Sequence, residues 1–180
     1  MIRRIIEVVA YNPQWPARFA QEKNLILGVL SAANIVDIHH IGSTSVEGLS
    51  AKPIIDILLE VHSLEALDAE SGQMQNLGYR VKGEFGIPGR RYFHKGSNQR
   101  SHHVHAFMTG SSEVQRHLAF RDYLREFPHI RDQYGQLKLE AASLHSDNIE
   151  QYMDHKNSFI KHHQQLAMEW QQPCCSNDNQ

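Results

Sequence analysis

The chain has 180 residues, of which 41% are hydrophobic and 21% are charged, and its formal net charge is −2. This length can bury a sizeable core without disulfides or metals, and we expect residues 1–170 to form a single domain, followed by a disordered polar tail at residues 171–180. The near-neutral charge gives no overall electrostatic case for binding nucleic acid or a membrane surface.

The first half of the chain mixes strand and helix patterns. Runs of β-branched residues predict strands, and apolar residues spaced three and four apart predict helices. The elements expected in this half are strands at residues 4–11, 35–42, 54–61, 79–85, 90–95 and 103–109 and helices at residues 17–33 and 64–78. Because residues 54–61 are apolar almost throughout, that strand should be buried on both faces. Ser63 is the expected cap of the helix that follows it.

From residue 112 onward the pattern becomes helical. Ser112 with Gln115, and Asp147 with Glu150, have the spacing of capping boxes, and Pro128 suits a first helical turn. Helices are therefore expected at residues 112–127, 128–145 and 147–170. Together the two halves predict an α+β fold, in which a mixed β-sheet core flanked by helices is followed by a helical C-terminal half.

The only two cysteines, Cys174 and Cys175, are neighbours in the polar tail. They form no disulfide framework, which is typical of a reducing compartment. No window approaches the roughly 18 apolar residues that a membrane helix needs, and the N-terminus lacks a signal-peptide pattern. We therefore expect a cytoplasmic protein that does not enter a membrane.

A hydroxyl-rich turn stands out in the stretch HHIGSTSVEGLSAKPIIDILLEV. Gly42 lets the backbone approach a ligand closely, and successive amides after such a turn can bind an anion. Ser43, Thr44 and Ser45 add hydroxyl groups, and Lys52 adds a point charge that suits phosphate. The spacing differs from that of a Walker loop. A phosphate-binding turn and a plain serine-rich turn are equal alternatives.

Asp56 stands inside the apolar strand of the same stretch, where an unpaired carboxylate is costly. It needs a cation, an arginine or several amide donors, so a metal ligand and a salt bridge to a buried arginine are both open. A strand repeats every two residues, which places Leu58 and Glu60 on the same face. Glu60 lies roughly 13 Å from Asp56 at about 3.3 Å per residue, too far for both carboxylates to bind one metal ion.

A second cluster of polar residues lies in HHVHAF. His103 and His105 alternate with Val104, so they project from one side of a strand about 6.6 Å apart. Two imidazoles placed in this way can share a divalent metal or flank a phosphate. A histidine-triad hydrolase would need histidine at Phe107, and two-histidine phosphoesterases need two separate His-x-Thr/Ser motifs. Both classes are disfavoured.

Four arginines lie near these motifs in the sequence. Arg90 and Arg91 begin a predicted strand, and Arg121 and Arg125 lie in a predicted helix. Arg91 or Arg121 could bind phosphate through paired hydrogen bonds or neutralise Asp56. For Arg125, exposure to solvent is the simpler interpretation.

Several of these motifs resemble those of the GrpB-type family: YNPQWPARF, HIGSTSVEGLSAKPIIDI, HHVH, FRDYLR, YGQLK and YMDHKNSFI. The resemblance extends over about residues 8–167, and this type of domain also forms the C-terminal appendix of some dephospho-coenzyme A kinases. It implies a nucleotidyltransferase-like fold, in which a Gly-Ser turn holds a nucleotide triphosphate and strand carboxylates hold Mg²⁺. By this resemblance Gly42 and Ser43 take the turn, and Asp56 takes the first carboxylate.

Two positions depart from the family pattern. Glu47 stands where the family usually has proline, which should affect only the rigidity of the loop. Leu58 replaces the second carboxylate of the metal-binding pair, and His103 or His105 is expected near the third. Two-metal phosphoryl transfer needs anionic ligands, whereas one carboxylate with two imidazoles suits Mn²⁺ or Zn²⁺ better than Mg²⁺. The usual two-metal mechanism is therefore not expected.

Two hypotheses about function follow. The first is metal-dependent nucleotidyl or phosphoryl transfer, with Asp56, His103 and His105 as catalytic residues and as ligands of Mg²⁺, Mn²⁺ or Zn²⁺. A nucleotide or phosphorylated small molecule would then be held by Gly42, Ser43, Thr44, Ser45, Lys52, Arg91 and Arg121. The second is a non-catalytic or accessory module that binds a nucleotide or a coenzyme A-like ligand in the same pocket. Neither hypothesis takes nucleic acid or a membrane as a partner.

Overall fold

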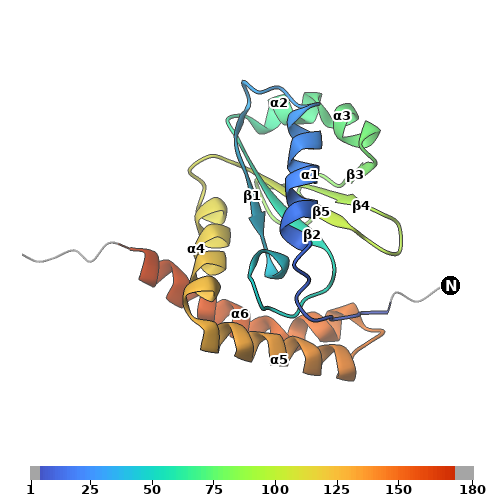
Figure 1. Ribbon diagram of the computed structural model, residues 1–180. Coiled ribbons are helices and arrows are strands. Elements are labelled where there is room, and N and C mark those ends of the chain that lie inside the picture. The colour runs from blue at the N-terminus through green and yellow to red at the C-terminus, as the bar shows by residue number, and fades with distance from the viewer. Residues whose placement is uncertain (1–4, 173–180) are drawn as a thin grey trace, which may run out of the picture.

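Five strands form one mixed sheet in the order β1-β2-β5-β4-β3 (Figure 1). The structure, a computed structural model, describes residues 5–172. Its strands are β1 (Ile35–Ile41), β2 (Ile55–Val61), β3 (Tyr79–Val81), β4 (Arg91–Lys95) and β5 (His102–Met108). Its helices are α1 (Trp15–Leu27), α2 (Leu64–Ala69), α3 (Ser71–Asn76), α4 (Ser112–Glu126), α5 (Pro128–Leu144) and α6 (Ile149–Gln171), and a short 3-10 helix, η1 (Ser43–Ser45), follows β1. The predicted α+β fold with a helical C-terminal half is confirmed.

The central pair of strands, β2 and β5, is parallel, whereas β1 with β2, β3 with β4 and β4 with β5 are antiparallel. Alternate residues of these strands enter two different layers of core. On one face Ile57, Leu59 and Val104 pack with Trp15 and Ile26 of α1, and all five are fully buried. The opposite face of β2 is covered as well. Burial on both faces explains why most residues of β2 are apolar.

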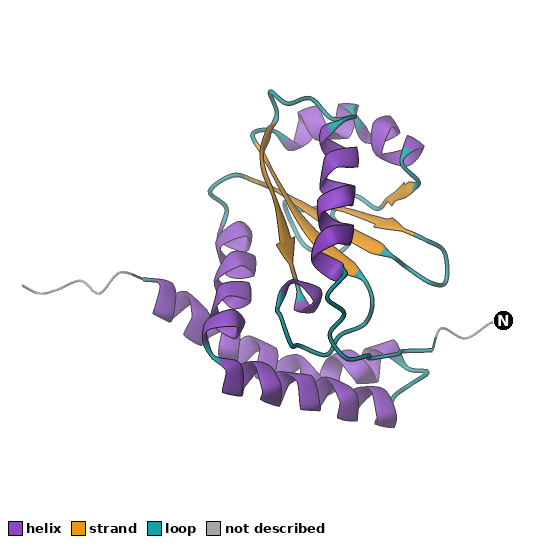
Figure 2. Cartoon of the chain, viewed as in Figure 1, coloured by secondary structure: helices purple, strands orange, loops and turns teal. Residues whose placement is uncertain are grey.

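Helix α4 packs against that opposite face of the sheet. There Leu58 is completely buried in a cluster with Ile41, Phe107 and Val114. The two layers place α1 and α4 on opposite sides of the sheet, as Figure 2 shows.

Helices α5 and α6 run side by side beneath the end of the sheet that carries η1 (Figure 1). Their apolar residues meet the loop after β1: Val46 and Leu49 pack with Leu124 of α4, Tyr134 of α5 and Phe159 of α6. Helices α4, α5 and α6 therefore pack against the loop that contains the hydroxyl-rich turn.

The strand predicted at residues 4–11 is wrong for the part that the structure describes. This segment makes one isolated bridge, between Val9 and Ala51. Ile6 instead packs against Ala141 of α5 and Tyr152 of α6. Its apolar side chains find a partner in the helical half, so the segment needs no place in the sheet.

Other element boundaries also differ from those expected. The helix predicted at 64–78 is two short helices that join at Glu70, although Ser63 does cap the first. Ser111 rather than Ser112 caps α4, and Asn148 rather than Asp147 caps α6. In each case the residue one place away has the extended backbone from which a side-chain oxygen reaches the first free amides.

Two further predictions concern the ends of the chain and the membrane. The tail was predicted at residues 171–180, but Gln171 is the last residue of helix α6. Residues 173–180, with both cysteines, lie outside the described residues. Across residues 5–172, no helix has the length and apolar character needed to cross a bilayer.

Candidate functional site

The register of the sheet brings the predicted site residues together. In the parallel β2–β5 pair, Asp56 lies opposite His103 and Leu58 opposite His105. Neighbours across a ladder point to the same face, so the carboxylate and both imidazoles leave the sheet on the side of α4. This is the face away from α1. The predicted convergence of Asp56, His103 and His105 is found.

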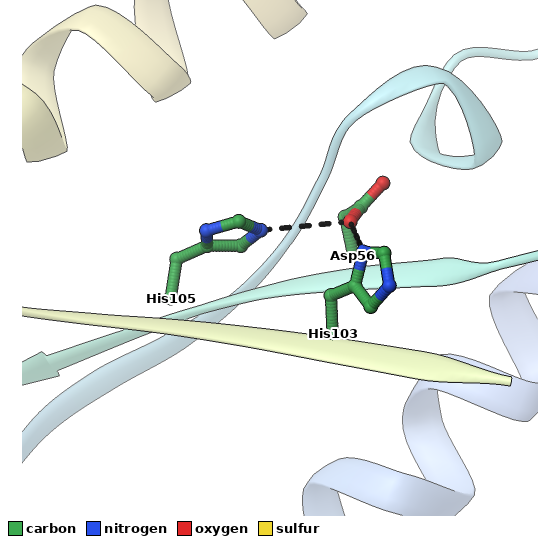
Figure 3. Close-up of side chains that lie close together, drawn as sticks. All are labelled: Asp56, His103 and His105. Atoms are coloured by element: carbon green, nitrogen blue, oxygen red, sulfur yellow. Dashed lines mark hydrogen bonds and ion pairs between the residues drawn. The ribbon is translucent and has the colours of Figure 1, made fainter. Parts of the chain in front are cut away.

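The three side chains meet at one carboxylate oxygen (Figure 3). His103 Nδ1 lies 3.1 Å from Asp56 Oδ1, and His105 Nε2 lies 3.6 Å from the same atom. One ligand atom from each residue falls within 4.8 Å of the other two. The side chains are partly exposed, 28% for Asp56 and 16% for each histidine, so a small ion or molecule can reach them from solvent.

Asp56 is an anion in this setting. Burial acts to raise the pKa of its carboxyl group, but hydrogen bonds and charge attraction from His103 and His105 outweigh it and hold the pKa well below its usual range. The site thus presents one negative charge flanked by two imidazole rings.

Residues of β4 and of the loop before it complete the surroundings of the histidines. Tyr92 lies opposite His105 in the ladder, and its ring centre is 5.3 Å from that of His105 and 5.6 Å from that of His103. Arg90 Nη1 is 3.5 Å from His105 Nδ1, and Arg90 also donates to the Phe85 carbonyl at 2.7 Å. Because a guanidinium can only donate, this contact leaves His105 Nε2 to face Asp56.

Tyr92 and His94 were missed as neighbours of the site although the sequence holds a signal for them. The same period of two that relates His103 to His105 relates Tyr92 to His94 in the next strand. The structure pairs His94 with His103 and Tyr92 with His105, so all four share one face. Only the pairing of the strands, which the sequence does not contain, was needed to place them.

Gly42 joins the turn to the acid. Its φ of 69° and ψ of −174° lie in a region that glycine alone adopts readily. A β-carbon at Gly42 would stand 2.6 Å from Asp56 Oδ2. The backbone of the turn therefore touches the carboxylate, as the predicted close approach requires.

Replacing Gly42 by alanine should lower the free energy of unfolding by about 1–3 kcal/mol, because of the backbone strain and the clash with Asp56. Urea denaturation measures the change. Gly72→Ala is the matched control: a β-carbon at Gly72, in α3, would meet nothing within 4 Å. A Gly42→Ala protein as stable as Gly72→Ala would contradict the close packing of turn and acid.

The hydroxyl groups of the turn do different work. Thr44 Oγ1 lies 2.9 Å from His40 Nε2, and Ser45 Oγ donates to the Gly42 carbonyl at 2.5 Å. Both are buried and hold the shape of η1. Ser43 is partly exposed, and its side chain is close enough to Tyr134 of α5 to lower the pKa of that phenol against the effect of burial. Of the three predicted hydroxyls, Ser43 is therefore the one best placed for a ligand.

Arg91 and Arg121 bind carboxylates other than that of Asp56. Arg91 is on the opposite face of the sheet, where its guanidinium forms paired hydrogen bonds with Asp68 at 2.7 and 2.8 Å. Arg121 donates to Asp122 at 2.7 Å and to the His40 carbonyl at 3.3 Å. We therefore leave Arg91 out of the site, since neighbouring residues of a strand point to opposite faces.

Lys52 leads from the turn to a group of lysines that the sequence analysis missed. Its Nζ is 5.1 Å from the centre of the Tyr152 ring, and Lys156 Nζ of α6 is 4.9 Å from the same centre. Lys138 of α5 is 2% exposed. Burial and repulsion by Lys52 lower the pKa of Lys156 to about 8, against attraction from Asp56. Helical periodicity alone could not show that these lysines lie close together, because their proximity depends on how α5 packs against α6.

This group makes stability depend on pH in a defined direction. The folded protein releases the Lys156 proton near pH 8, whereas the unfolded chain keeps it up to its ordinary pKa of 10.5. The unfolded state thus binds more protons in this range, so the free energy of unfolding should rise by up to about 1 kcal/mol per pH unit for each such lysine.

Urea denaturation between about pH 8 and pH 9.5 measures this slope. The charged or titratable groups that face Lys156 are Lys52, Lys138, Asp56 and Tyr152, and burial raises the pKa of Tyr152 to about 12. Lys156 titrates at the lower end of this window, whereas Asp56 and Tyr152 keep their charge state throughout it. Lys156→Met should flatten the slope, and a wild-type slope that is flat or falling would contradict the burial of these ammonium groups.

Comparison with known proteins assigns the chain to a family. The model of the family described as GrpB protein matches residues 5–166. The chain belongs to the GrpB family. A crystal structure of conserved protein GrpB from Enterococcus faecalis is similar with a TM-score of 0.87 and 43% identity, over 91% of this chain and 98% of that one.

Other relatives are longer than this chain. The UPF0157 protein YqkA of Bacillus subtilis is 46% identical over 93% of the chain, which spans about half (49%) of its length. A dephospho-CoA kinase of Mycobacterium bovis is 27% identical over 91% of the chain and 46% of its own length. The predicted kinship with a part of such kinases is confirmed.

The fold extends to a nucleotide polymerase. The Cid1 poly(U) polymerase, in a crystal structure with MgGTP bound, superposes with a TM-score of 0.51 and 13% identity, over 74% of this chain and 43% of that one. At this identity the likeness concerns the fold alone. The GrpB chain has a nucleotidyltransferase-like fold, as the family resemblance implied.

Proposed function

We propose that this GrpB protein binds one divalent metal ion together with a nucleotide or a phosphorylated small molecule, and that it transfers a nucleotidyl or phosphoryl group. The observation that carries the proposal is the meeting of Asp56, His103 and His105 at one point beside the Gly42 turn. The nucleotidyltransferase-like fold supports the class of ligand by analogy.

The donor set fits a metal of intermediate hardness. One carboxylate oxygen and two imidazole nitrogens lie within 4.8 Å of one another and are open to solvent on one side. Such a set suits Zn²⁺ or Mn²⁺, whereas Mg²⁺ demands a shell of oxygen ligands. Small shifts of the two rings would bring all three atoms to ligand distance, so we expect Mn²⁺ or Zn²⁺ to bind here more tightly than Mg²⁺.

The roles of the chain's own residues follow from their places. Asp56, His103 and His105 would hold the metal, which when bound would polarise a phosphoryl oxygen and offset its negative charge. Ser43 and backbone amides at the start of η1 would hold a phosphate at the turn. A metal bound to His105 Nε2 would leave the ring proton on Nδ1, so Arg90 would no longer donate to that atom, and Tyr92 would limit the movement of both rings by packing against them.

A second function, binding without catalysis, is favoured by one observation. Leu58 occupies the strand position where a second acid would stand, and it is completely buried among Ile41, Phe107 and Val114. An apolar cluster under α4 therefore fills the place that a second metal would need. A protein with this pocket could keep its ligand without transforming it, as an accessory module would.

Turnover separates the two functions. The protein would be incubated with ATP and Mn²⁺ or Zn²⁺, with water or a small alcohol as acceptor, and followed by ³¹P NMR, with Asp56→Asn as the control. Transfer predicts loss of the ATP signals at a rate that Asp56→Asn abolishes. Metal-dependent ATP binding without turnover would overturn transfer with this nucleotide and favour the accessory function. ATP binding that ignores both metal and Asp56→Asn would refute the metal-dependent site itself.

A further inference from the structure

Lys138 is the most unusual charged residue of the molecule. It lies on α5 with 2% of its surface exposed, and its Nζ is buried without a hydrogen-bond partner among residues 5–172. The Nζ atom of Lys138 lies over the Tyr134 ring, 4.4 Å from the ring centre. An ammonium group taken out of water costs several kcal/mol unless an anion accompanies it. A lysine in this position needs an explanation that core packing does not give, because methionine or leucine would fill the space at lower cost.

Two further lysines lie near Lys138. Lys156, on α6, is 8% exposed, and Lys52 comes from the loop before β2; their Nζ atoms lie over the same Tyr152 ring. Burial, followed by repulsion from Lys156 and Lys52, lowers the pKa of Lys138 well below its usual value. Like charges within mutual reach destabilise the ligand-free fold, yet three separate segments supply them.

The acid that faces this group is already engaged. Among the described side chains that shift the pKa of Lys138 and Lys156, Asp56 is the acidic one, and its Oδ1 is shared by two histidines. One carboxylate thus faces both Lys138 and Lys156. An incoming ligand with several negative charges would restore the balance.

The lysine group is continuous with the proposed metal site. Ser43, at the start of η1, lies close enough to Tyr134 to influence its pKa, and the ring of Tyr134 lies against Lys138. On the other side of Ser43 is Gly42, packed on Asp56. Helix α5 also approaches the loop closely, since a β-carbon at Gly135 would be 3.5 Å from Leu49 Cδ1. The path from Asp56 to the lysines therefore runs along one turn, with α5 and α6 as its far wall.

We propose that Lys52, Lys138 and Lys156 form an oligophosphate pocket between η1 and the helices α5 and α6, which binds the phosphates of the ligand that lie farther from the metal. This inference rests on the proposed function for the orientation of the ligand, but it adds its class: a compound with two or more linked phosphates. A nucleoside triphosphate and a free inorganic oligophosphate share this chemistry, and ammonium groups on three segments suit its spread-out charge.

Binding of inorganic triphosphate, with EDTA present to remove metals, tests the pocket directly. Isothermal titration calorimetry would compare wild type with Lys138→Met and Lys156→Met, and with Lys161→Met, an exposed lysine on the same helix α6, as the matched control. We expect each pocket variant to weaken binding about tenfold or more and the control to change nothing. Circular dichroism and thermal melting check that each variant is folded, and Lys156→Met decides if Lys138→Met does not fold.

Three results would overturn the inference. They are triphosphate binding by folded Lys138→Met and Lys156→Met as tight as that of wild type, inorganic phosphate binding as tightly as triphosphate, and no binding of triphosphate at all. Mn²⁺ titration of the same variants keeps the two proposals apart. If the protein binds Mn²⁺ but the lysine variants bind triphosphate as tightly as wild type, the pocket is refuted and the metal site stands. If the lysine variants lose triphosphate binding but the protein does not bind Mn²⁺, the metal site is refuted and the pocket stands. ATP against triphosphate, both with EDTA, distinguishes the two sources: tighter binding of ATP indicates a nucleotide and equal binding a free oligophosphate, and either supports the pocket.

Discussion

Replacement of Asp56 by asparagine is expected to weaken the binding of Mn²⁺ or Zn²⁺ by at least about 100-fold, since even the loss of an outer partner of a metal ligand costs 10–100-fold. The change removes the one negative charge that His103 and His105 share in the structure. The remaining amide oxygen is a neutral donor that holds a cation more weakly. Titration calorimetry in a buffer that does not bind metals measures the loss.

Asp154→Asn provides the control for this experiment. Asp154 lies on the exposed side of α6, and its replacement by asparagine changes the net charge of the protein by the same amount as Asp56→Asn. Metal affinity should stay close to the wild-type value in this variant, because Asp154 is not part of the Asp56, His103 and His105 cluster and salt screens an exposed charge. If both variants bind metal equally well, the metal is held somewhere other than at Asp56.

Replacement of Lys138 by methionine is expected to stabilise the ligand-free protein by about 1–4 kcal/mol, the range seen when buried charges give way to apolar residues of similar size. Lys138 is 2% exposed and its Nζ has no partner within the described chain. Methionine keeps the unbranched stem and removes the amine. For a protein of this size the gain corresponds to roughly 2–4 °C in Tm per kcal/mol.

The same variant should lose the stabilisation that triphosphate gives to wild type. Differential scanning calorimetry with and without triphosphate measures both effects in one series, with Lys161→Met as the reference. A residue kept for ligand binding at the expense of stability must show both changes. A Lys138→Met protein that is less stable than wild type without ligand would mean that Lys138 serves the fold through packing or an internal contact.

Much of the sheet could be predicted because its strands carry strong local signals. The run at residues 54–61 is apolar enough to require cover on both faces, and α1 and α4 supply it. The strand predicted at residues 4–11 had the same local signal but a different outcome. Its Ile6 is buried by Ala141 and Tyr152, residues more than 130 positions away in the sequence, and no local pattern contains that information.

The candidate site divides in the same way. Asp56, His103 and His105 could be proposed because each strand shows its own alternation, and only the adjacency of β2 and β5 had to be inferred. The lysine group could not be proposed, because Lys52, Lys138 and Lys156 lie on three elements whose contacts arise from helix packing. Arg91 shows the opposite failure. Arg91 is the first residue of β4, next to Tyr92, and neighbouring strand residues point to opposite faces. Its side chain therefore lies on the face away from the site.

The direct test of the central claim is anomalous diffraction from crystals soaked in Mn²⁺, recorded above and below the manganese absorption edge. One metal site built from a carboxylate and two imidazoles predicts a single anomalous peak between Asp56, His103 and His105, within about 2.0–2.4 Å of one atom from each. Buried Leu58 leaves room for no second ion beside it. Two peaks about 3.5–4 Å apart, or no peak at these residues, would contradict the account.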